Sequence, residues 1–284
     1  MFRRQTSGSV VCVSCGYLVG VRDDRCYHCG RRNPGLFGFA PALRSLGHDL
    51  GFVPFMIGFC GLMYAITVLV GGVNIGGGLL GILAPSGQAL LVFGSSGAVP
   101  VFEFGRWWTV LSAQWLHGSL LHIFFNVMFI RQLAPGVGEL YGAGRMVIIY
   151  TIAGICGFAV TSVVGQYLTL PWPLSGAPFT VGASASGFGL LGALVYYGRR
   201  TGSSLVRGQA ISWAISAFVF GFIMQGIDNY AHAGGFVGGY LAGRALDPLK
   251  PEHITHMLVA VLCLAASVIS IIVSVLHYAY LARM

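Results

Sequence analysis

Four polar side chains stand in otherwise apolar stretches of the sequence, and together they could carry out acyl transfer. Ser184 lies in "TVGASASGFGLLGALV", residues 180–195, and His232 lies near the start of a later apolar stretch. An imidazole can accept the proton of a serine hydroxyl near neutral pH and so make it a nucleophile. His122, Asn126 and the backbone N–H of Ser184 could donate hydrogen bonds to the resulting oxyanion. These residue types predict Ser–His hydrolytic chemistry that needs no cofactor.

Helices long enough to cross a bilayer must position these side chains. The chain has 284 residues, of which 56% are hydrophobic and only 8% are charged. This composition is far from that of a soluble domain, and about 20 apolar residues suffice to span a membrane. The sequence therefore predicts an all-α, multi-pass integral membrane protein. We expect seven spans, near residues 51–70, 116–133, 146–165, 181–198, 210–225, 230–245 and 257–277.

The basic residues predict the orientation of these spans. Of the 16 Lys and Arg residues, all but Arg106 and Arg283 fall on one side of the membrane if the spans alternate. Cytoplasmic loops carry an excess of positive charge, so we expect the N-terminus in the cytoplasm. The same bias accounts for the net charge of +8, so we expect no nucleic-acid partner. The first apolar run starts after about 50 residues, so we expect no cleavable signal peptide.

This orientation brings the polar residues to a common depth. The second, fourth and sixth spans run from outside to inside, so residues early in each lie in the outer leaflet. Ser184 and His232 are both early in their spans, and His122 and Asn126 share one face of the second span because they are four residues apart. No Asp or Glu lies deep in a span, and the sequence HExxH is absent. Both observations argue against an aspartyl or zinc intramembrane protease and against a carboxylate-based transporter.

Four cysteines near the N-terminus predict a metal site. They form two CxxC pairs within "CVSCGYLVGVRDDRCYHCG": Cys12 with Cys15, and Cys26 with Cys29. Two such turns can close a tetrahedron of thiolates around Zn²⁺. Disulfides are the alternative, which a reducing cytoplasm disfavours. We expect a small structural zinc ribbon with no catalytic role.

Glycines in the sixth predicted span indicate where helices meet. Gly235 and Gly239 form a GxxxG pattern, and small residues let membrane helices pack backbone to backbone. This pattern fits close contact between the fourth and sixth spans. A hydrogen bond of about 2.6–3.2 Å between Ser184 and His232 requires such contact.

Three segments resemble the rhomboid family of intramembrane serine proteases. "HGSLLHIFFN" is similar to the family's H-x4-H-x3-N helix, "GASASGFGLLGA" to its GxSx nucleophile motif, and "DNYAHAGGFVGGYLAG" to its His-bearing last core span. Their order and spacing match over about residues 50–248. The resemblance implies a six-helix rhomboid-like bundle, to which this chain adds a seventh C-terminal helix.

The resemblance also implies a role for each matching residue. Ser184 matches the nucleophile and His232 the base of a Ser–His dyad, while His122 and Asn126 match the oxyanion-side residues. Phe188 matches an aromatic residue that packs on the catalytic imidazole. Further matches are His117, as a structural histidine, and Glu139 and Arg145, in the loop between the second and third spans.

Two departures from the family pattern leave questions open. Family members often carry Trp-Arg before the second span, whereas Trp108 here is followed by Thr109, and Arg106 cannot be assumed to replace that arginine. The residue after the nucleophile is often Gly and here is Ala185. Sliding the motif by two residues would make Ser186 the nucleophile.

The sequence thus predicts an intramembrane serine endopeptidase that cleaves transmembrane proteins near the outer face of, we expect, a bacterial cytoplasmic membrane. A catalytically silent, client-binding rhomboid-like protein is the alternative, and a zinc-ribbon scaffold or transporter is less favoured. The oligomeric state is left open. We expect a ribbon at 1–35, a basic linker at 36–49, the core at 50–248 and an added loop and helix at 249–284.

Overall fold

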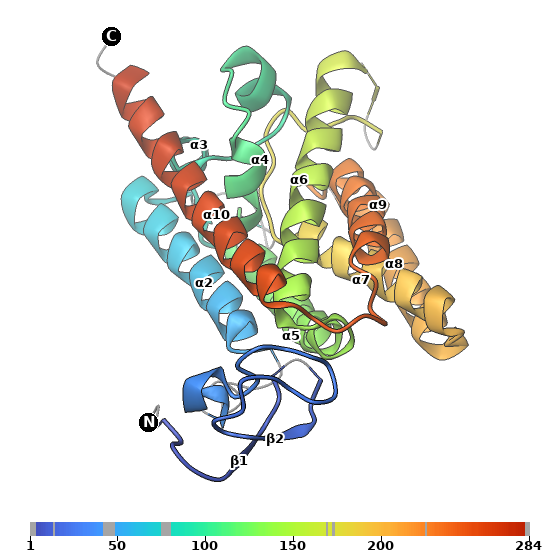
Figure 1. Cartoon of the computed structure of the whole chain (residues 1–284). Helices are drawn as coiled ribbons and strands as arrows, with labels where there is room; N and C mark the ends of the chain where they lie inside the picture. The colour runs from blue at the N-terminus through green and yellow to red at the C-terminus, as the bar shows by residue number, and fades with distance from the viewer. Residues whose placement is uncertain are drawn as a thin grey trace.

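The computed structural model describes residues 4–13, 15–41, 49–74, 81–168, 170–171, 174–224 and 226–281. Each of the seven predicted spans coincides with a long helix, drawn in Figure 1. These helices are α2 (Phe52–Gly71), α5 (Leu120–Tyr141), α6 (Ala143–Tyr167), α7 (Ser184–Thr201), α8 (Ser204–Ile223), α9 (Asn229–Ala245) and α10 (Ile254–Leu281). The ribbon and the end of α10 lie at opposite ends of the bundle in Figure 1, as an odd number of crossings requires.

Five of these helices are long and apolar enough to cross a membrane by themselves: α2, α5, α6, α8 and α10. Helix α7 falls short of that measure because glycine, serine and arginine dilute its apolar residues, and α9, with 17 residues, is also too short. Both pack against α6 and against each other. The least apolar helices therefore lie inside the bundle, where their polar groups can be used.

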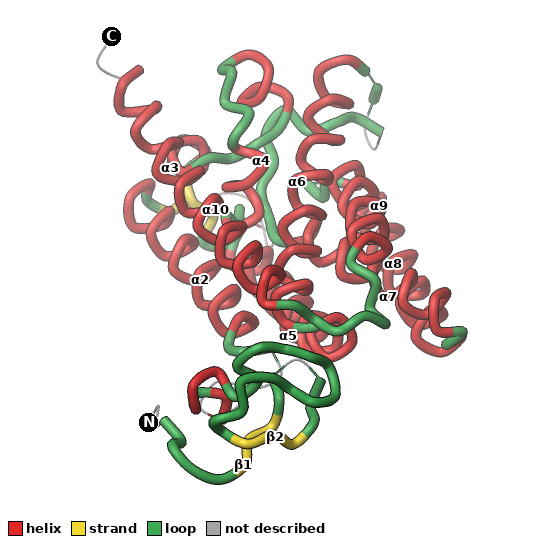
Figure 2. The backbone as a smooth tube through the Cα atoms, viewed as in Figure 1, coloured by secondary structure: helices red, strands yellow, loops and turns green. Residues whose placement is uncertain are grey.

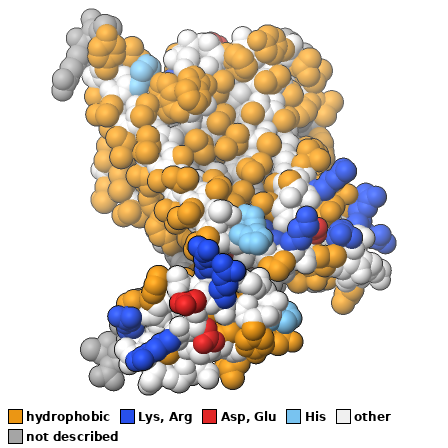
Figure 3. Space-filling model, viewed as in Figure 1, with side chains coloured by type: hydrophobic (Ala, Val, Ile, Leu, Met, Phe, Trp, Pro, Cys, Tyr) orange, Lys and Arg blue, Asp and Glu red, His pale blue; other side chains and the backbone are white. Residues whose placement is uncertain are grey.

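The outer surface of the helical body supports a membrane location. Figure 3 shows hydrophobic side chains over most of this face, whereas Lys and Arg gather at the ribbon and at the adjoining end of the bundle. Large side chains such as Leu69, Leu262 and Leu276 are more than half exposed on their helices. Such a surface would be unfavourable in water and suits contact with lipid chains. The protein is an integral membrane protein.

The ends of α5 and α6 correct one sequence expectation. Residues Glu139 and Arg145 were expected in a loop, but they lie in the last turn of α5 and the first turn of α6. Gly142 alone joins the two helices, with φ of +99°, a conformation that glycine adopts without strain. The buried Arg145 guanidinium donates to three backbone carbonyls of the segment between α9 and α10, at Leu246, Asp247 and Lys250.

A small ribbon precedes the bundle. Strands β1 (Ser9–Val11) and β2 (Leu18–Gly20) pair antiparallel with Val10 opposite Val19, and these two valines are buried with Cys12 and Cys26. Among the described residues, the other strands form a short pair near α3 in Figure 2, namely β3 (Val73–Asn74) and β4 (Ala84–Pro85). Part of the expected basic linker, residues 42–48, lies outside the described residues.

Residues 81–119, between α2 and α5, form a cap of short helices at the end of the bundle away from the ribbon, which we call the outer cap. These are α3 (Gly87–Phe93), the π-helical turn η3 (Val99–Glu103), α4 (Thr109–Ser112) and the 3-10 turn η4 (Ala113–Trp115). Ser96 and Thr180 exchange backbone hydrogen bonds of 3.0 and 2.8 Å. The cap is thereby joined to the strand-like segment that leads into α7 and Ser184.

Candidate active site

Helices α7 and α9 approach so closely that only glycine fits between them. A Cβ atom on Gly235 would collide with the carbonyl group of Ala185, and one on Gly239 would collide with the backbone of Gly189. Removing the side chain lets two membrane helices pack backbone to backbone. The GxxxG face of α9 therefore brings the first turn of α9 beside the first turn of α7.

Ser184 and His232 meet at this contact. The Ser184 Oγ lies 2.9 Å from His232 Nε2, within hydrogen-bond range. Ser184 is the first residue of α7, and His232 lies in the first turn of α9. His232 is 6% exposed. The arrangement gives a hydroxyl whose proton can pass directly to a neighbouring imidazole.

The His232 ring is held by stacking and by its helix. The Phe188 ring, one turn after Ser184, stacks on the imidazole with centroids 4.2 Å apart and planes 13° apart. Asp228 caps α9 by accepting the Ala231 N–H at 3.0 Å, as a helix-start residue does. The His232 Nδ1 has no hydrogen-bond partner among the described residues. The geometry is therefore that of a pair, without an acidic third member.

His122 faces the same small volume as the serine. Its Nδ1 accepts the Gly118 N–H at 3.3 Å, which leaves Nε2 as the proton-bearing nitrogen of the neutral ring. A Cβ on Gly182 would lie 2.6 Å from His122 Nε2 and 3.7 Å from Ser184 Oγ. Gly182 is required there, since its φ is also +133°. The His122 N–H can thus act as a donor beside the hydroxyl.

Asn126 and His117 support this helix. The Asn126 Nδ2 donates to the His122 carbonyl at 2.8 Å, and the second N–H of that amide is left for another acceptor. His117 is fully buried and packs edge-on against His122, with ring centroids 5.2 Å apart. His117 lies in the segment before α5, and its ring nitrogens make no hydrogen bond among the described residues, which fits a structural role.

Ser186 has a different partner from Ser184. Its hydroxyl donates to Gln114 Oε1 at 2.9 Å, and both side chains are fully buried. No hydrogen bond joins Ser186 to His232 in the described part of the chain. Gln114 was not expected at the site, although an amide between Ala113 and Trp115, three residues before His117, was a signal in the sequence.

Arg106 anchors the outer cap, which answers the question raised by Thr109. The Arg106 guanidinium is 1% exposed and donates to the carbonyls of Leu91 at 2.8 Å and Ser274 at 3.1 Å. The Thr109 hydroxyl donates to the Arg106 carbonyl at 2.7 Å. The hydrogen bonds of Arg106 therefore hold the turn from Arg106 to Thr109, which contains Trp107 and Trp108.

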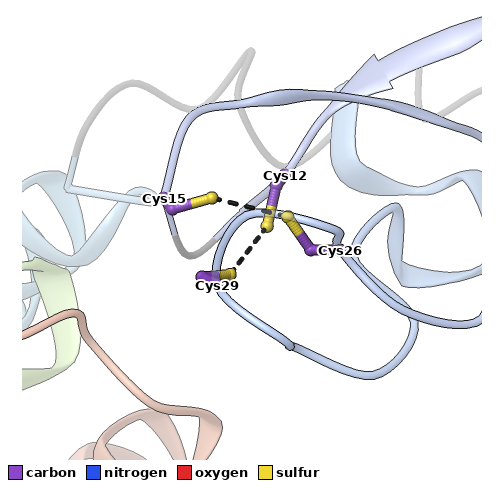
Figure 4. A group of neighbouring side chains, drawn as sticks. All are labelled: Cys12, Cys15, Cys26 and Cys29. Atoms are coloured by element: carbon purple, nitrogen blue, oxygen red, sulfur yellow. Dashed lines mark hydrogen bonds between the residues drawn. The ribbon is translucent and has the colours of Figure 1, made fainter.

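The four ribbon cysteines form a candidate metal centre, shown in Figure 4. Their sulfur atoms all lie within 4.8 Å of one another, with Cys12–Cys29 at 3.8 Å and Cys15–Cys26 at 3.6 Å. These distances exclude disulfides and match the sulfur–sulfur spacing of about 3.8 Å that a tetrahedron with metal–sulfur bonds of ~2.3 Å requires. The backbone N–H of Cys29 lowers the pKa of Cys26 to about 7, whereas burial raises that of Cys15 to about 12. The sulfur atoms fit a closed, four-coordinate metal site.

Comparison with known proteins gives a family for the chain. The rhomboid domain family model matches residues 104–248. The rhomboid protease GluP of Bacillus subtilis is 31% identical over 185 residues, which cover 64% of this chain and 34% of GluP. The rhomboid-like protease 3 of Toxoplasma gondii is 29% identical over 161 residues, covering 55% of this chain and 57% of that protein.

A third relative carries a different description. The inactive RHOMBOID-like protein 8 of Arabidopsis thaliana is 31% identical over 162 residues, covering 55% of this chain and 42% of that protein. The matches thus span between about a third and three fifths of the length of these relatives. The matched region contains Ser184, His232, His122 and Asn126, and it extends over half of the chain, so this protein belongs to the rhomboid family.

Proposed function

We propose that this protein is an intramembrane serine endopeptidase that cleaves transmembrane segments of other membrane proteins. The observation that carries the proposal is the contact of 2.9 Å between Ser184 Oγ and His232 Nε2 inside a membrane-spanning bundle. The stacked Phe188 ring and the adjacent His122 N–H complete a site suited to acyl transfer.

In the proposed reaction, Ser184 Oγ attacks the carbonyl carbon of a substrate peptide bond while its proton passes to His232 Nε2. The carbonyl oxygen becomes an oxyanion, which accepts hydrogen bonds from His122 Nε2, the Ser184 N–H and the free Asn126 N–H. His232 then returns the proton to the leaving amine as the C–N bond breaks, which leaves an acyl-enzyme on Ser184. Water attacks this ester and gives a proton to His232, which returns it to Ser184 Oγ as the acyl C–O bond breaks, so that the carboxylic product and the free serine hydroxyl are released.

The substrate class follows from the place of the site. A peptide bond in a helix is shielded by its neighbours, so the segment to be cut must unwind before Ser184 can reach it. We therefore propose cleavage next to small residues, near the outer membrane face. With the N-terminus in the cytoplasm, that face lies outside a bacterial cytoplasmic membrane.

A fluorophosphonate probe on purified protein tests the proposal. We expect labelling of the wild type to disappear in Ser184→Ala and His232→Ala. The Ser186→Ala variant should stay labelled, because the Ser186 hydroxyl of the wild type donates its hydrogen bond to Gln114 and not to the imidazole. Labelling lost only in Ser186→Ala would move the nucleophile by two residues. A wild type that is folded but unlabelled would favour the client-binding alternative. One relative of this chain is described as inactive.

We also propose that the ribbon, residues 1–35, binds one structural Zn²⁺. Four thiolates would hold the ion and leave no open position for water, so its chemistry is to stabilise the fold of the ribbon. Beyond it we propose the linker at 36–49, the protease core at 50–248 and the added loop and helix at 249–284. The cleavage chemistry proposed above uses no atom of the ribbon.

A further inference from the structure

Helix α10 carries polar side chains on a buried face, which is unexpected in a helix that otherwise meets lipid. Ser267, Ser270 and Ser274 are at most 3% exposed and lie on one side because they are spaced by three and four residues. The Ser267 hydroxyl donates to the Cys263 carbonyl of its own helix at 3.0 Å. The other two serines make contacts outside α10.

Ser270 and Ser274 bind the Arg106–Thr109 turn of the outer cap. The Ser270 hydroxyl donates to the Trp108 carbonyl at 2.8 Å, and the Trp108 indole N–H donates to Ser274 Oγ at 3.0 Å. The Ser274 carbonyl accepts from Arg106. Gly94 of the outer cap packs closely against α10, since a Cβ on Gly94 would lie 2.6 Å from Ser274 Oγ. Three hydrogen bonds thus fasten this turn to α10.

The fastened turn continues directly into the residues that bracket Ser184. Helix α4 begins at Thr109 and leads into η4. The Ala113 carbonyl in η4 accepts the Gly182 N–H at 2.9 Å, two residues before Ser184. Gln114, the next residue of η4, accepts from Ser186, two residues after Ser184. Both contacts place η4 as the support of the serine turn.

We propose that α10 is part of the active-site frame, with Ser270, Ser274 and Trp108 acting as positioning residues for Ser184. This inference rests on the proposed function, and it concerns a helix that lies beyond the matched rhomboid domain at residues 104–248. The anchor holds the Arg106–Thr109 turn, the turn holds η4, and η4 holds the backbone on both sides of the nucleophile. Neither serine touches the reacting atoms.

The test compares Trp108→Phe and Ser270→Ala with matched controls in the full-length protein in lipid vesicles. Trp107→Phe removes the same N–H from an indole that is 69% exposed, and Ser267→Ala removes a hydroxyl that serves only its own helix. Each anchor variant loses one neutral hydrogen bond, so we expect kcat and the rate of Ser184 labelling to fall about five-fold. KM should be unchanged, and the controls should remain within about two-fold of wild type.

Hydrogen exchange provides a readout that does not depend on activity. The Gly182 amide should exchange faster in both anchor variants than in the controls, because its η4 acceptor is less firmly held. The inference would be overturned if Trp108→Phe and Ser270→Ala matched their controls in exchange, kcat and labelling. It would also be overturned if these two variants differed from the controls only by a lower melting temperature. A wild type that is never labelled would instead refute the proposed function, while exchange at Gly182 would still decide whether α10 supports the serine turn.

Discussion

The substitution Gly235→Ala tests how tightly the contact between Ser184 and His232 depends on helix packing. Gly235 lies one turn after His232 on α9, and it faces Ala185, which follows Ser184 on α7. An added Cβ would lie 2.8 Å from the Ala185 carbonyl carbon, whereas ordinary contact begins at 3.4 Å. The Ala185 carbonyl oxygen lies closer still, so the helices must separate by at least about 0.6 Å, because neither backbone can turn aside in a close-packed interior.

This separation acts almost directly on the reacting atoms. Added to the present distance of 2.9 Å, it places Ser184 Oγ at least about 3.5 Å from His232 Nε2, outside the usual hydrogen-bond range of about 2.7–3.2 Å. A misplacement approaching 1 Å can reduce catalysis about 10²-fold. We expect kcat to fall on that order, with about 1–3 kcal/mol of stability lost to overpacking.

The assay measures cleavage of a reporter transmembrane substrate in vesicles, together with fluorophosphonate labelling and thermal unfolding of the same preparations. Gly208→Ala is the matched control, since a Cβ at that position in α8 meets nothing within 4 Å. Gly235→Ala protein that melts cooperatively but cleaves and labels slowly would support the reasoning. Cleavage at the wild-type rate would refute it, because the pair would then tolerate separated helices.

Three further predictions concern the ribbon and the α6 corner. Cys12→Ser should lower bound zinc from about one ion per chain to near zero by elemental analysis, while Ser184 labelling persists; lost labelling would show that the ribbon supports the core. Arg145→Gln leaves its three carbonyl acceptors poorly paired and should reduce stability by about 3 kcal/mol in thermal unfolding, unlike the exposed Arg131→Gln. Burial raises the pKa of Glu252, so its protonated form favours the fold and that contribution is lost as pH rises through the raised pKa. The melting temperature of wild type relative to Glu252→Gln should therefore fall from acidic to neutral pH, and a constant difference would contradict this.

Local pattern was sufficient for much of the fold and for the candidate residues. Apolar runs of about 20 residues predict spans because each helix satisfies its own backbone hydrogen bonds, whatever its neighbours are. The predicted ends were less accurate. The second span extends to Tyr141 rather than residue 133, and it begins after Ser119, which caps α5 by accepting the His122 N–H. Helix ends depend on such single capping bonds, which hydropathy does not register.

The histidines and the asparagine were identifiable because these residue types are rare in the apolar stretches of the chain, and Ser184 was identifiable from the GxSx pattern around it. Ser184, His232, His122 and Asn126 stand out among residues that a membrane interior otherwise favours. The assignment of Ser184 rather than Ser186 is different in kind. Both serines are in α7, two residues apart, and their side chains diverge around the helix to His232 and to Gln114.

What the sequence alone determined is therefore the membrane class, the approximate spans, the cysteine cluster and the set of residues able to do acyl transfer. These properties depend on composition and on short spacings along the chain. Tertiary structure decided which serine contacts the imidazole, that Gln114 binds Ser186, and how α10 holds the outer cap. Ser186 and Gln114 are 72 positions apart, and Arg106 and Ser274 are 168 apart. Such bonds form only when packing brings distant segments within about 3 Å, because hydrogen bonds weaken steeply beyond that range.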